Sequence, residues 1–197
     1  HATGYAMGIQ FDGAYATGKP DKDEAVIVYF GDGASSQGDV SEALIFAASF
    51  QTPQVFFLQN NHWAISVPVS RQSRTPLYLR PSGFGIPGMQ IDGNDVLASY
   101  AVTTASLDAA RSGEGPQFIE ALTYRMGAHT TSDDPTKYRD EADLDFWVKH
   151  DPIPRFEAYL RSKGADDAFF AELVDEAEHA ADEIRVRTLA LGVPTAD

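Results

Sequence analysis

The chain has 197 residues, of which 43% are hydrophobic and 22% charged, a composition typical of one globular domain rather than a disordered segment. Its 15 Lys and Arg against 29 Asp and Glu give a formal charge of −14, which argues against nucleic acid as a partner because phosphate binding needs clustered basic residues. The lack of cysteine excludes disulfides and thiolate metal sites, and no apolar run approaches the ~20 residues that span a membrane.

Short apolar runs alternate with helical patterns along the chain. The runs at 25–30 and 54–59 are typical of strands buried on both faces, and the spacing of Val40, Leu44 and Ala47 indicates a helix between them. In chain order we expect a helix at 2–16, a strand at 25–30, a helix at 39–50, a strand at 54–59, an irregular segment at 66–88, a helix at 96–111, a strand at 117–124, a polar loop at 125–139, and helices at 143–150, 154–163 and 166–191. This order predicts an α/β fold, a doubly wound and mostly parallel sheet with a C-terminal helical tail.

Polar residues directly follow the first two predicted strands. Asp32 lies in a Gly-Asp-Gly turn after the first strand, and Asn61 lies in an Asn-Asn pair after the second. If the strands are neighbours, their ends lie ~5 Å apart, at the edge where open parallel sheets bind ligands. A carboxylate and an amide oxygen are hard ligands suited to magnesium or calcium, and small residues at 33–36 let a phosphate approach backbone amides. We therefore predict a magnesium–diphosphate site.

Each motif alone also has a simpler interpretation. Gly-Asp-Gly is most often only a turn, and Asn60-Asn61 could be a left-handed turn pair. GDGASSQG matches neither the dinucleotide fingerprint nor the Walker loop. The two motifs in this order are more specific than either one, although a flavodoxin-like phosphate-binding module remains an alternative.

Four stretches extend this pattern: YFGDGASSQGDVSEALIFAASF, FFLQNNHWAISVPVSRQ, QIDGNDV and ALTYRMGAHTTSDDPTKYR. With them the chain resembles thiamine-diphosphate enzymes, and among these the α subunit of the first, decarboxylating component of 2-oxo acid dehydrogenase complexes. The resemblance implies a thiamine-diphosphate-binding α/β domain over 1–139, with 140–197 as a helical extension of the same domain. It also implies a longer subunit, whose upstream part is absent from this sequence.

The resemblance assigns the cofactor site residue by residue. It implies that magnesium is bound by the side chains of Asp32 and Asn61 and by the backbone carbonyl of Trp63. Gly33 and Ala34 would contact the cofactor diphosphate through backbone groups.

Two further positions are assigned by the same resemblance. Gln59 stands where some relatives have a phosphate-binding arginine, and its neutral amide can still donate a hydrogen bond. His129 matches the active-site histidine of the family in the RxGxH frame that begins at Arg125. Without the resemblance, a histidine in a polar loop is more often a surface residue. With an unperturbed pKa of about 6.5, His129 could hydrogen-bond the oxo acid or assist acyl transfer to lipoamide.

The loop around His129 matches a regulated loop of the family. Arg125, Asp133, Tyr138 and Arg139 match positions that order it through ion pairs and hydrogen bonds. Thr130 stands where mitochondrial relatives have a phosphorylated serine, which makes phosphorylation there possible without implying it.

The implied function is oxidative decarboxylation of a 2-oxo acid, with acyl transfer to the lipoyl group of an acyltransferase. The implied cofactors are thiamine diphosphate and magnesium, and the implied partners are a β subunit in an α2β2 heterotetramer and the lipoyl-bearing acyltransferase. FGIPGMQIDGNDV and TSDDPTKYR favour branched-chain substrates. A pyruvate or acetoin dehydrogenase α subunit and a noncatalytic fragment that keeps the fold are the alternatives. With no secretory leader visible, we expect bacterial cytoplasm, or the mitochondrial matrix in a eukaryote.

Overall fold

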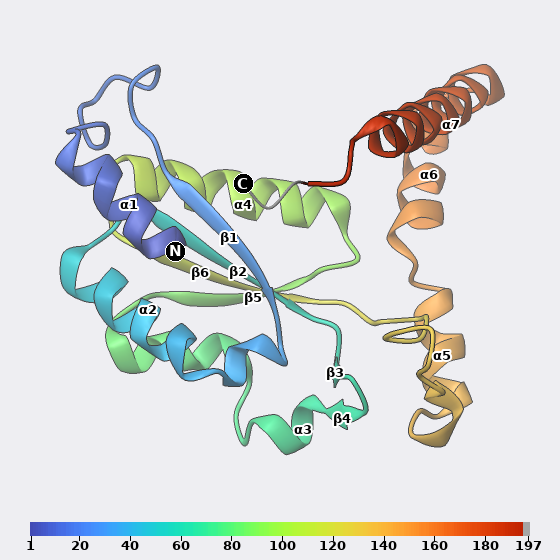
Figure 1. Ribbon diagram of the computed structural model, residues 1–197, viewed down its shortest axis with the longest axis horizontal. Helices are drawn as coiled ribbons and strands as arrows, with labels where there is room; N and C mark the ends of the chain where they lie inside the picture. The colour runs from blue at the N-terminus through green and yellow to red at the C-terminus, as the bar shows by residue number, and fades with distance from the viewer. Residues whose placement is uncertain (195–197) are drawn as a thin grey trace. The chain divides into compact units, whose positions relative to one another are not determined.

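A four-stranded parallel sheet with the order β1-β2-β6-β5 forms the centre of the computed structural model, which describes residues 1–194 (Figure 1). Its strands are β1 (Val26–Gly31), β2 (Gln54–Asn60), β5 (Gly88–Asp92) and β6 (Gln117–Leu122). The remaining elements are α1 (Ala2–Phe11), η1 (Ala34–Ser36), α2 (Gly38–Phe50), the small hairpin of β3 (Trp63–Ala64) and β4 (Val67–Pro68), α3 (Val69–Gln72), η2 (Leu77–Phe84), α4 (Val96–Arg111), η3 (Pro135–Lys137), α5 (Glu141–Val148), α6 (Pro152–Ser162) and α7 (Asp167–Ala190). The predicted parallel pairing of β1 and β2 around α2 is confirmed.

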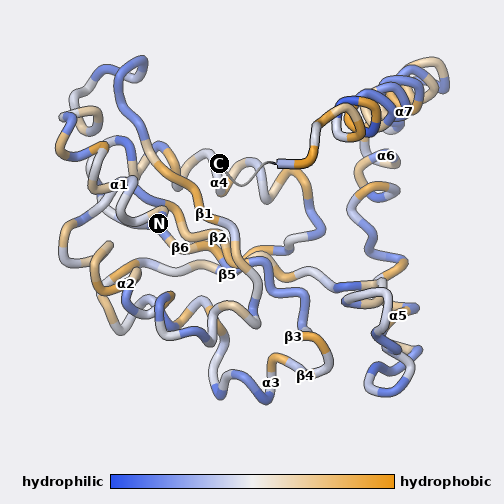
Figure 2. The backbone as a smooth tube through the Cα atoms, viewed as in Figure 1, coloured by the Kyte–Doolittle hydropathy of each residue, from blue (hydrophilic) through white to orange (hydrophobic). Residues whose placement is uncertain are grey.

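Helices cover both faces of this sheet. Because successive side chains of a strand point to opposite faces, β2 contributes Phe56 and Leu58 to one apolar core and Val55 and Phe57 to the other. The first core includes residues of α2 and η2, the second includes residues of α4, and Figure 1 shows α2 and α4 on opposite sides of the sheet. The strands between them form the most continuous hydrophobic part of the chain (Figure 2). The predicted doubly wound α/β architecture is therefore confirmed.

Two predicted elements differ from those observed. The first helix ends at Phe11 rather than residue 16, because the chain turns at Gly13, whose φ of +65° is a conformation that favours glycine. The strand predicted to run to residue 124 ends at Leu122. The sequence also missed β5, an edge strand whose residues are exposed or half-buried and so lack a continuous apolar run.

The segment at 66–88, predicted to be irregular, is more ordered than its Pro and Gly content indicates. It contains β4, α3 and η2, and Leu77 and Ile86 are buried in the core on the α2 side of the sheet. This segment therefore closes one face of the domain rather than only connecting two elements.

Contacts between residues divide the chain into two compact units. His1–Pro152 form the first unit, which contains the sheet and α5, and the described residues from Ile153 onward form the second. None of the described residues of α6 or α7 is buried. The predicted grouping of 140–197 as one extension stays a prediction. Among the described residues, none of the helices has the length and apolarity needed to cross a membrane.

Candidate functional site

The two loops predicted to form the site lie against each other. β1 and β2 are neighbours with Gly31 opposite Gln59, so the Gly-Asp-Gly and Asn-Asn turns leave the sheet at the same edge. A Cβ atom on Gly33 would lie 2.9 Å from Cβ of Ala64, closer than real Cβ atoms approach one another. Glycine at position 33 therefore allows the first loop to pack directly on the segment that follows the second.

Asp32 is the buried carboxylate of this edge, with only 1% of its surface exposed. Its Oδ2 accepts a hydrogen bond of 2.8 Å from Nε2 of Gln72, which belongs to α3. A buried carboxylate is costly unless its charge is compensated, and the Gln72 amide is neutral. A cation bound to Asp32 would supply the charge that the amide does not.

The turn after Asp32 is held by a side chain from far along the sequence. Ser35 Oγ donates to the Asp32 carbonyl at 2.6 Å, while Arg80 Nη1 donates to the Ser35 carbonyl at 2.7 Å and to its Oγ at 2.8 Å. The sequence predicted that this loop leads directly into a helix. The structure instead places the short 3-10 turn η1 here, with Gly33 as its N-cap, and α2 begins only at Gly38.

The Asn-Asn turn is folded by its own side chains. Asn60 Oδ1 accepts from the His62 backbone N–H and Asn61 Oδ1 accepts from that of Trp63, both at 3.0 Å. The left-handed backbone expected of such a pair falls on His62, with a φ of +71°. Asn61 is half-buried, and an amide oxygen has a second lone pair that could bind a metal. Gln59, the last of the predicted phosphate contacts, is exposed.

Arg125 joins the Asn-Asn turn to the loop that carries His129. Its backbone N–H donates to the Asn61 carbonyl at 3.3 Å, and its Nη1 donates to the Trp63 carbonyl at 3.3 Å. A carbonyl oxygen also has two lone pairs, so this bond leaves one for a metal. Nη2 of Arg125 donates to the Ile65 carbonyl and to the Tyr138 hydroxyl, each at 2.7 Å.

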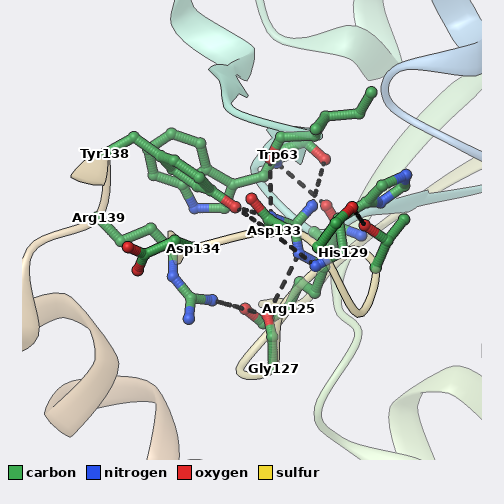
Figure 3. A network of polar contacts seen from close by, with 12 residues as sticks. Trp63, Arg125, Gly127, His129, Asp133, Asp134, Tyr138 and Arg139 are labelled. Carbon is green, nitrogen blue, oxygen red and sulfur yellow. Dashed lines mark hydrogen bonds and ion pairs between the residues drawn. The ribbon is translucent and has the colours of Figure 1, made fainter. Parts of the chain in front are cut away.

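Asp133 is the centre of the predicted ordering network (Figure 3). Its Oδ2 accepts from the His129 backbone N–H at 2.8 Å and from the Tyr138 hydroxyl at 2.6 Å, and lies 3.8 Å from Arg125 Nη2. The hydrogen bonds from His129 and then Tyr138 hold the pKa of the Asp133 carboxyl below its usual value. Burial, followed by the hydrogen bond to Asp133, raises the pKa of Tyr138. The His129 side chain itself is exposed.

Arg139 closes the base of this loop. Its guanidinium donates to the carbonyls of Arg125, Met126 and Gly127, with Met126 at 2.9 Å and Gly127 at 3.2 Å. Its Cζ lies 5.8 Å from the ring centroid of Tyr124. The contacts predicted for Arg125, Asp133, Tyr138 and Arg139 are therefore present, while Thr130 is exposed and its Oγ1 lies 3.2 Å from Ser132 Oγ.

The donors at this edge are chemically mixed. No group of three or more His, Cys, Asp or Glu side chains that could hold a metal occurs among residues 1–194. The available oxygens are instead a carboxylate, an amide and a carbonyl, a set suited to a hard cation that keeps water or phosphate ligands. Sequence reasoning missed Gln72 and Arg80, since they lie in the segment predicted to be irregular and no pattern marks their partners.

Comparisons with known proteins agree with this geometry. Residues 1–184 match the model of the dehydrogenase E1 component family. The chain is 49% identical over 187 residues to the α subunit of 3-methyl-2-oxobutanoate dehydrogenase from Mycobacterium tuberculosis, covering 94% of this chain and 49% of that relative. It is 49% identical over 143 residues to the pyruvate dehydrogenase E1 component subunit alpha of Acholeplasma laidlawii, and 46% identical over 153 residues to that of Staphylococcus aureus; these matches cover 72% and 77% of this chain and 41% of each relative. The chain thus spans about half the length of these relatives or less.

Proposed function

We propose, since the chain belongs to the dehydrogenase E1 component family, that it supplies part of an α subunit that oxidatively decarboxylates a 2-oxo acid and transfers the acyl group to a lipoyl group. The observation that carries this proposal is the packing of Gly33 on Ala64, which brings the Gly-Asp-Gly and Asn-Asn loops into contact at the carboxyl edge of β1 and β2. Ligands of open parallel sheets bind at that edge.

Thiamine diphosphate and magnesium are the proposed cofactors. The side chains of Asp32 and Asn61 and the carbonyl of Trp63 would hold the metal, a donor set that suits magnesium, and the burial of Asp32 beside a neutral amide favours a cation there. When bound, the thiazolium ring supplies the electron sink that decarboxylation needs.

The diphosphate would be held by backbone groups of the turn after Asp32. Gly33 and Ala34 lie where that turn begins, and Gln59 lies at the neighbouring strand end. The hydrogen bonds of Arg80 to Ser35 fix the shape of the turn before any ligand arrives, which lowers the entropy cost of binding.

His129 is the proposed catalytic residue. Its backbone is fixed by Asp133, while its exposed imidazole is free to meet substrate. An imidazole near neutral pH can donate a hydrogen bond to an oxo acid, or hold and return a proton during acyl transfer.

Branched-chain 2-oxo acids are the favoured substrate class. The relative matched over 94% of this chain is named for 3-methyl-2-oxobutanoate, whereas the pyruvate-named relatives match 72% and 77%. Their similar identity keeps pyruvate as the second candidate. We also propose a β subunit in an α2β2 assembly and a lipoyl-bearing acyltransferase as partners, and a bacterial cytoplasmic location.

The test uses the full-length subunit assembled with its β partner. We expect CO2 release and lipoyl acylation with 3-methyl-2-oxobutanoate, and a lower kcat/KM with pyruvate. Replacing Asp32 with Ala should abolish magnesium-dependent binding of thiamine diphosphate in calorimetry, whereas Asp39→Ala, an exposed carboxylate in the first turn of α2, should not. Wild-type affinity in the Asp32 variant would refute the metal assignment. Cofactor binding with no turnover of either acid would favour a noncatalytic role.

A further inference from the structure

Glu120 is a buried carboxylate that the proposed chemistry does not use. It lies in β6 with 1% of its surface exposed, among the buried apolar residues Phe118, Ile119 and Ala121. Charged residues are rarely buried in a central strand, because the loss of hydration must be offset by hydrogen bonds or an ion pair. A hydrophobic residue would pack here at lower cost, so the carboxylate calls for a specific explanation.

Three donors from three different segments converge on Glu120. Asn60 Nδ2 at the end of β2 donates to Oε1 at 2.7 Å. The Tyr78 backbone N–H in η2 donates to Oε2 at 2.9 Å, and Gln90 Nε2 in β5 donates to the same oxygen at 3.0 Å. All three donors are neutral, so the carboxylate acts as an acceptor hub and not as half of an ion pair with any of them.

The bond from Asn60 determines how that side chain is oriented. A carboxylate can only accept, so it selects the amide nitrogen of Asn60 and turns the amide oxygen away. That oxygen accepts the His62 backbone N–H at 3.0 Å, which holds His62 at its φ of +71°. With the opposite amide orientation, the NH2 group would face the His62 N–H, and neither end of Asn60 would be satisfied.

We propose that Glu120 is a positioning residue for the metal turn, acting through Asn60 to hold Asn61 and Trp63 where their oxygens can bind the cation. This role rests on the proposed function and deepens it. It divides the Asn-Asn pair into two roles: Asn60 connects the turn to the sheet interior, and Asn61 presents the ligand. Through Tyr78 and Gln90, the same carboxylate ties the turn to η2 and to the edge strand β5.

The test exchanges the donor and the acceptor of one hydrogen bond. In E120Q the new amide cannot serve all three donors, and in N60D two carboxylates face each other across 2.7 Å. The double variant N60D/E120Q restores every bond. The new amide nitrogen at position 120 donates to the new carboxylate at position 60, and the new amide oxygen accepts from Tyr78 and Gln90. The carboxylate at position 60 still accepts from the His62 backbone N–H. Position 60 lines a cavity of about 320 Å³, which gives the relocated charge room for water.

The measurement is magnesium-dependent binding of thiamine diphosphate to the full-length αβ enzyme, followed by calorimetry and by steady-state kinetics. Each single variant should raise the magnesium half-saturation by about tenfold or more, as loss of a hydrogen bond to a charged group does, with kcat at saturating magnesium changed by less than about twofold. The double variant should return the half-saturation to within about threefold of wild type. E114Q, which neutralises an exposed carboxylate just before β6, is the matched control and should change nothing.

The outcomes separate this role from the function on which it rests. Wild-type enzyme that binds no thiamine diphosphate at any magnesium concentration overturns the proposed function and this role with it. Wild-type binding that both single variants retain, even with lowered thermal stability, overturns the role of Glu120 alone. A double variant that binds as poorly as the single variants also overturns it. Where E120Q does not fold, N60D compared with the double variant carries the same test.

Discussion

Gly33 shows how one missing side chain shapes the site. Its φ of −60° is open to any residue, so the requirement for glycine comes from space and not from backbone conformation. A Cβ atom would meet Ala64 Cβ at 2.9 Å and Ala64 Cα at 3.4 Å. The contact lies between the two loops that carry Asp32 and Asn61, so any enlargement pushes the proposed metal ligands apart.

Replacing Gly33 with Ala should therefore harm both stability and binding. We expect a loss of about 1–3 kcal/mol in unfolding free energy, the usual cost of overpacking, together with weaker magnesium-dependent cofactor binding. Chemical denaturation and calorimetry measure the two effects. Gly38→Ala is the matched control, because a Cβ atom there would have nothing within 4 Å. Equal behaviour of the two variants would contradict the close contact at Gly33.

His129 separates the roles of backbone and side chain in one residue. Asp133 binds the backbone N–H, which alanine retains, so His129→Ala should leave the loop ordered. We expect nearly unchanged cofactor binding and a fall of about 10²–10⁴-fold in lipoyl acylation, the range of a lost general acid or base. His179→Ala, an exposed histidine in α7, is the control for loss of an imidazole. Undiminished acylation in the His129 variant would remove its catalytic role.

At the scale of an element, the loop at 125–139 depends on the charge of one carboxylate. The folded pKa of Asp133 lies below the unfolded value of about 3.9, so protons bind more readily to the unfolded state. The stabilisation is fully present above about pH 4 and is lost as pH falls through the folded pKa. The raised pKa of Tyr138 keeps its hydroxyl a donor beyond its usual value of about 10.

We therefore predict that the order of this loop is constant from about pH 5 to 9 and is lost only in acid. Limited proteolysis at 125–139 across pH measures it. Tyr138→Phe removes a donor to Asp133, so its acid transition should move to higher pH, whereas Tyr5→Phe in α1 should leave it in place. A transition near pH 6.5 would instead implicate His129.

Elements with a strong apolar period were predictable from the sequence, and those stabilised by distant contacts were not. The predicted helix at 96–111 coincides with α4, and the first two strands were predicted to within one residue. β5 escaped prediction because an exposed edge strand has no continuous apolar run. α1 was predicted too long because its Ala and Gly residues continue past the turn at Gly13.

The site divides in the same way. Asp32 and Asn61 were found because ligands gather where parallel strands end, which is a rule of local sequence once the strands are known. Gln72, Arg80 and Glu120 act on partners 40, 45 and 60 positions away, and such distances leave no periodic signal. The resemblance supplied the roles of single residues, which neither charge nor spacing could have assigned.

At the scale of the whole molecule, the residues assigned to the cofactor all address its charged end. Asp32, Asn61 and Trp63 would meet the metal, and Gly33 and Ala34 the phosphates, whereas none of them is assigned to the rings. With a formal charge of −14, the chain repels a free diphosphate, so the metal must carry the interaction.

The 197-residue chain alone should therefore bind magnesium pyrophosphate and magnesium thiamine diphosphate with affinities within about threefold, or ~0.7 kcal/mol, and neither without magnesium. Competition calorimetry measures the ratio, and Asp32→Ala should abolish both. The full-length αβ assembly should instead prefer the thiamine compound, because the longer subunit and its partner add contacts to the rings. A preference of more than about tenfold for thiamine diphosphate by the chain alone would mean that this half of the subunit also recognises the rings. Equal binding would confine its recognition to the metal and the diphosphate.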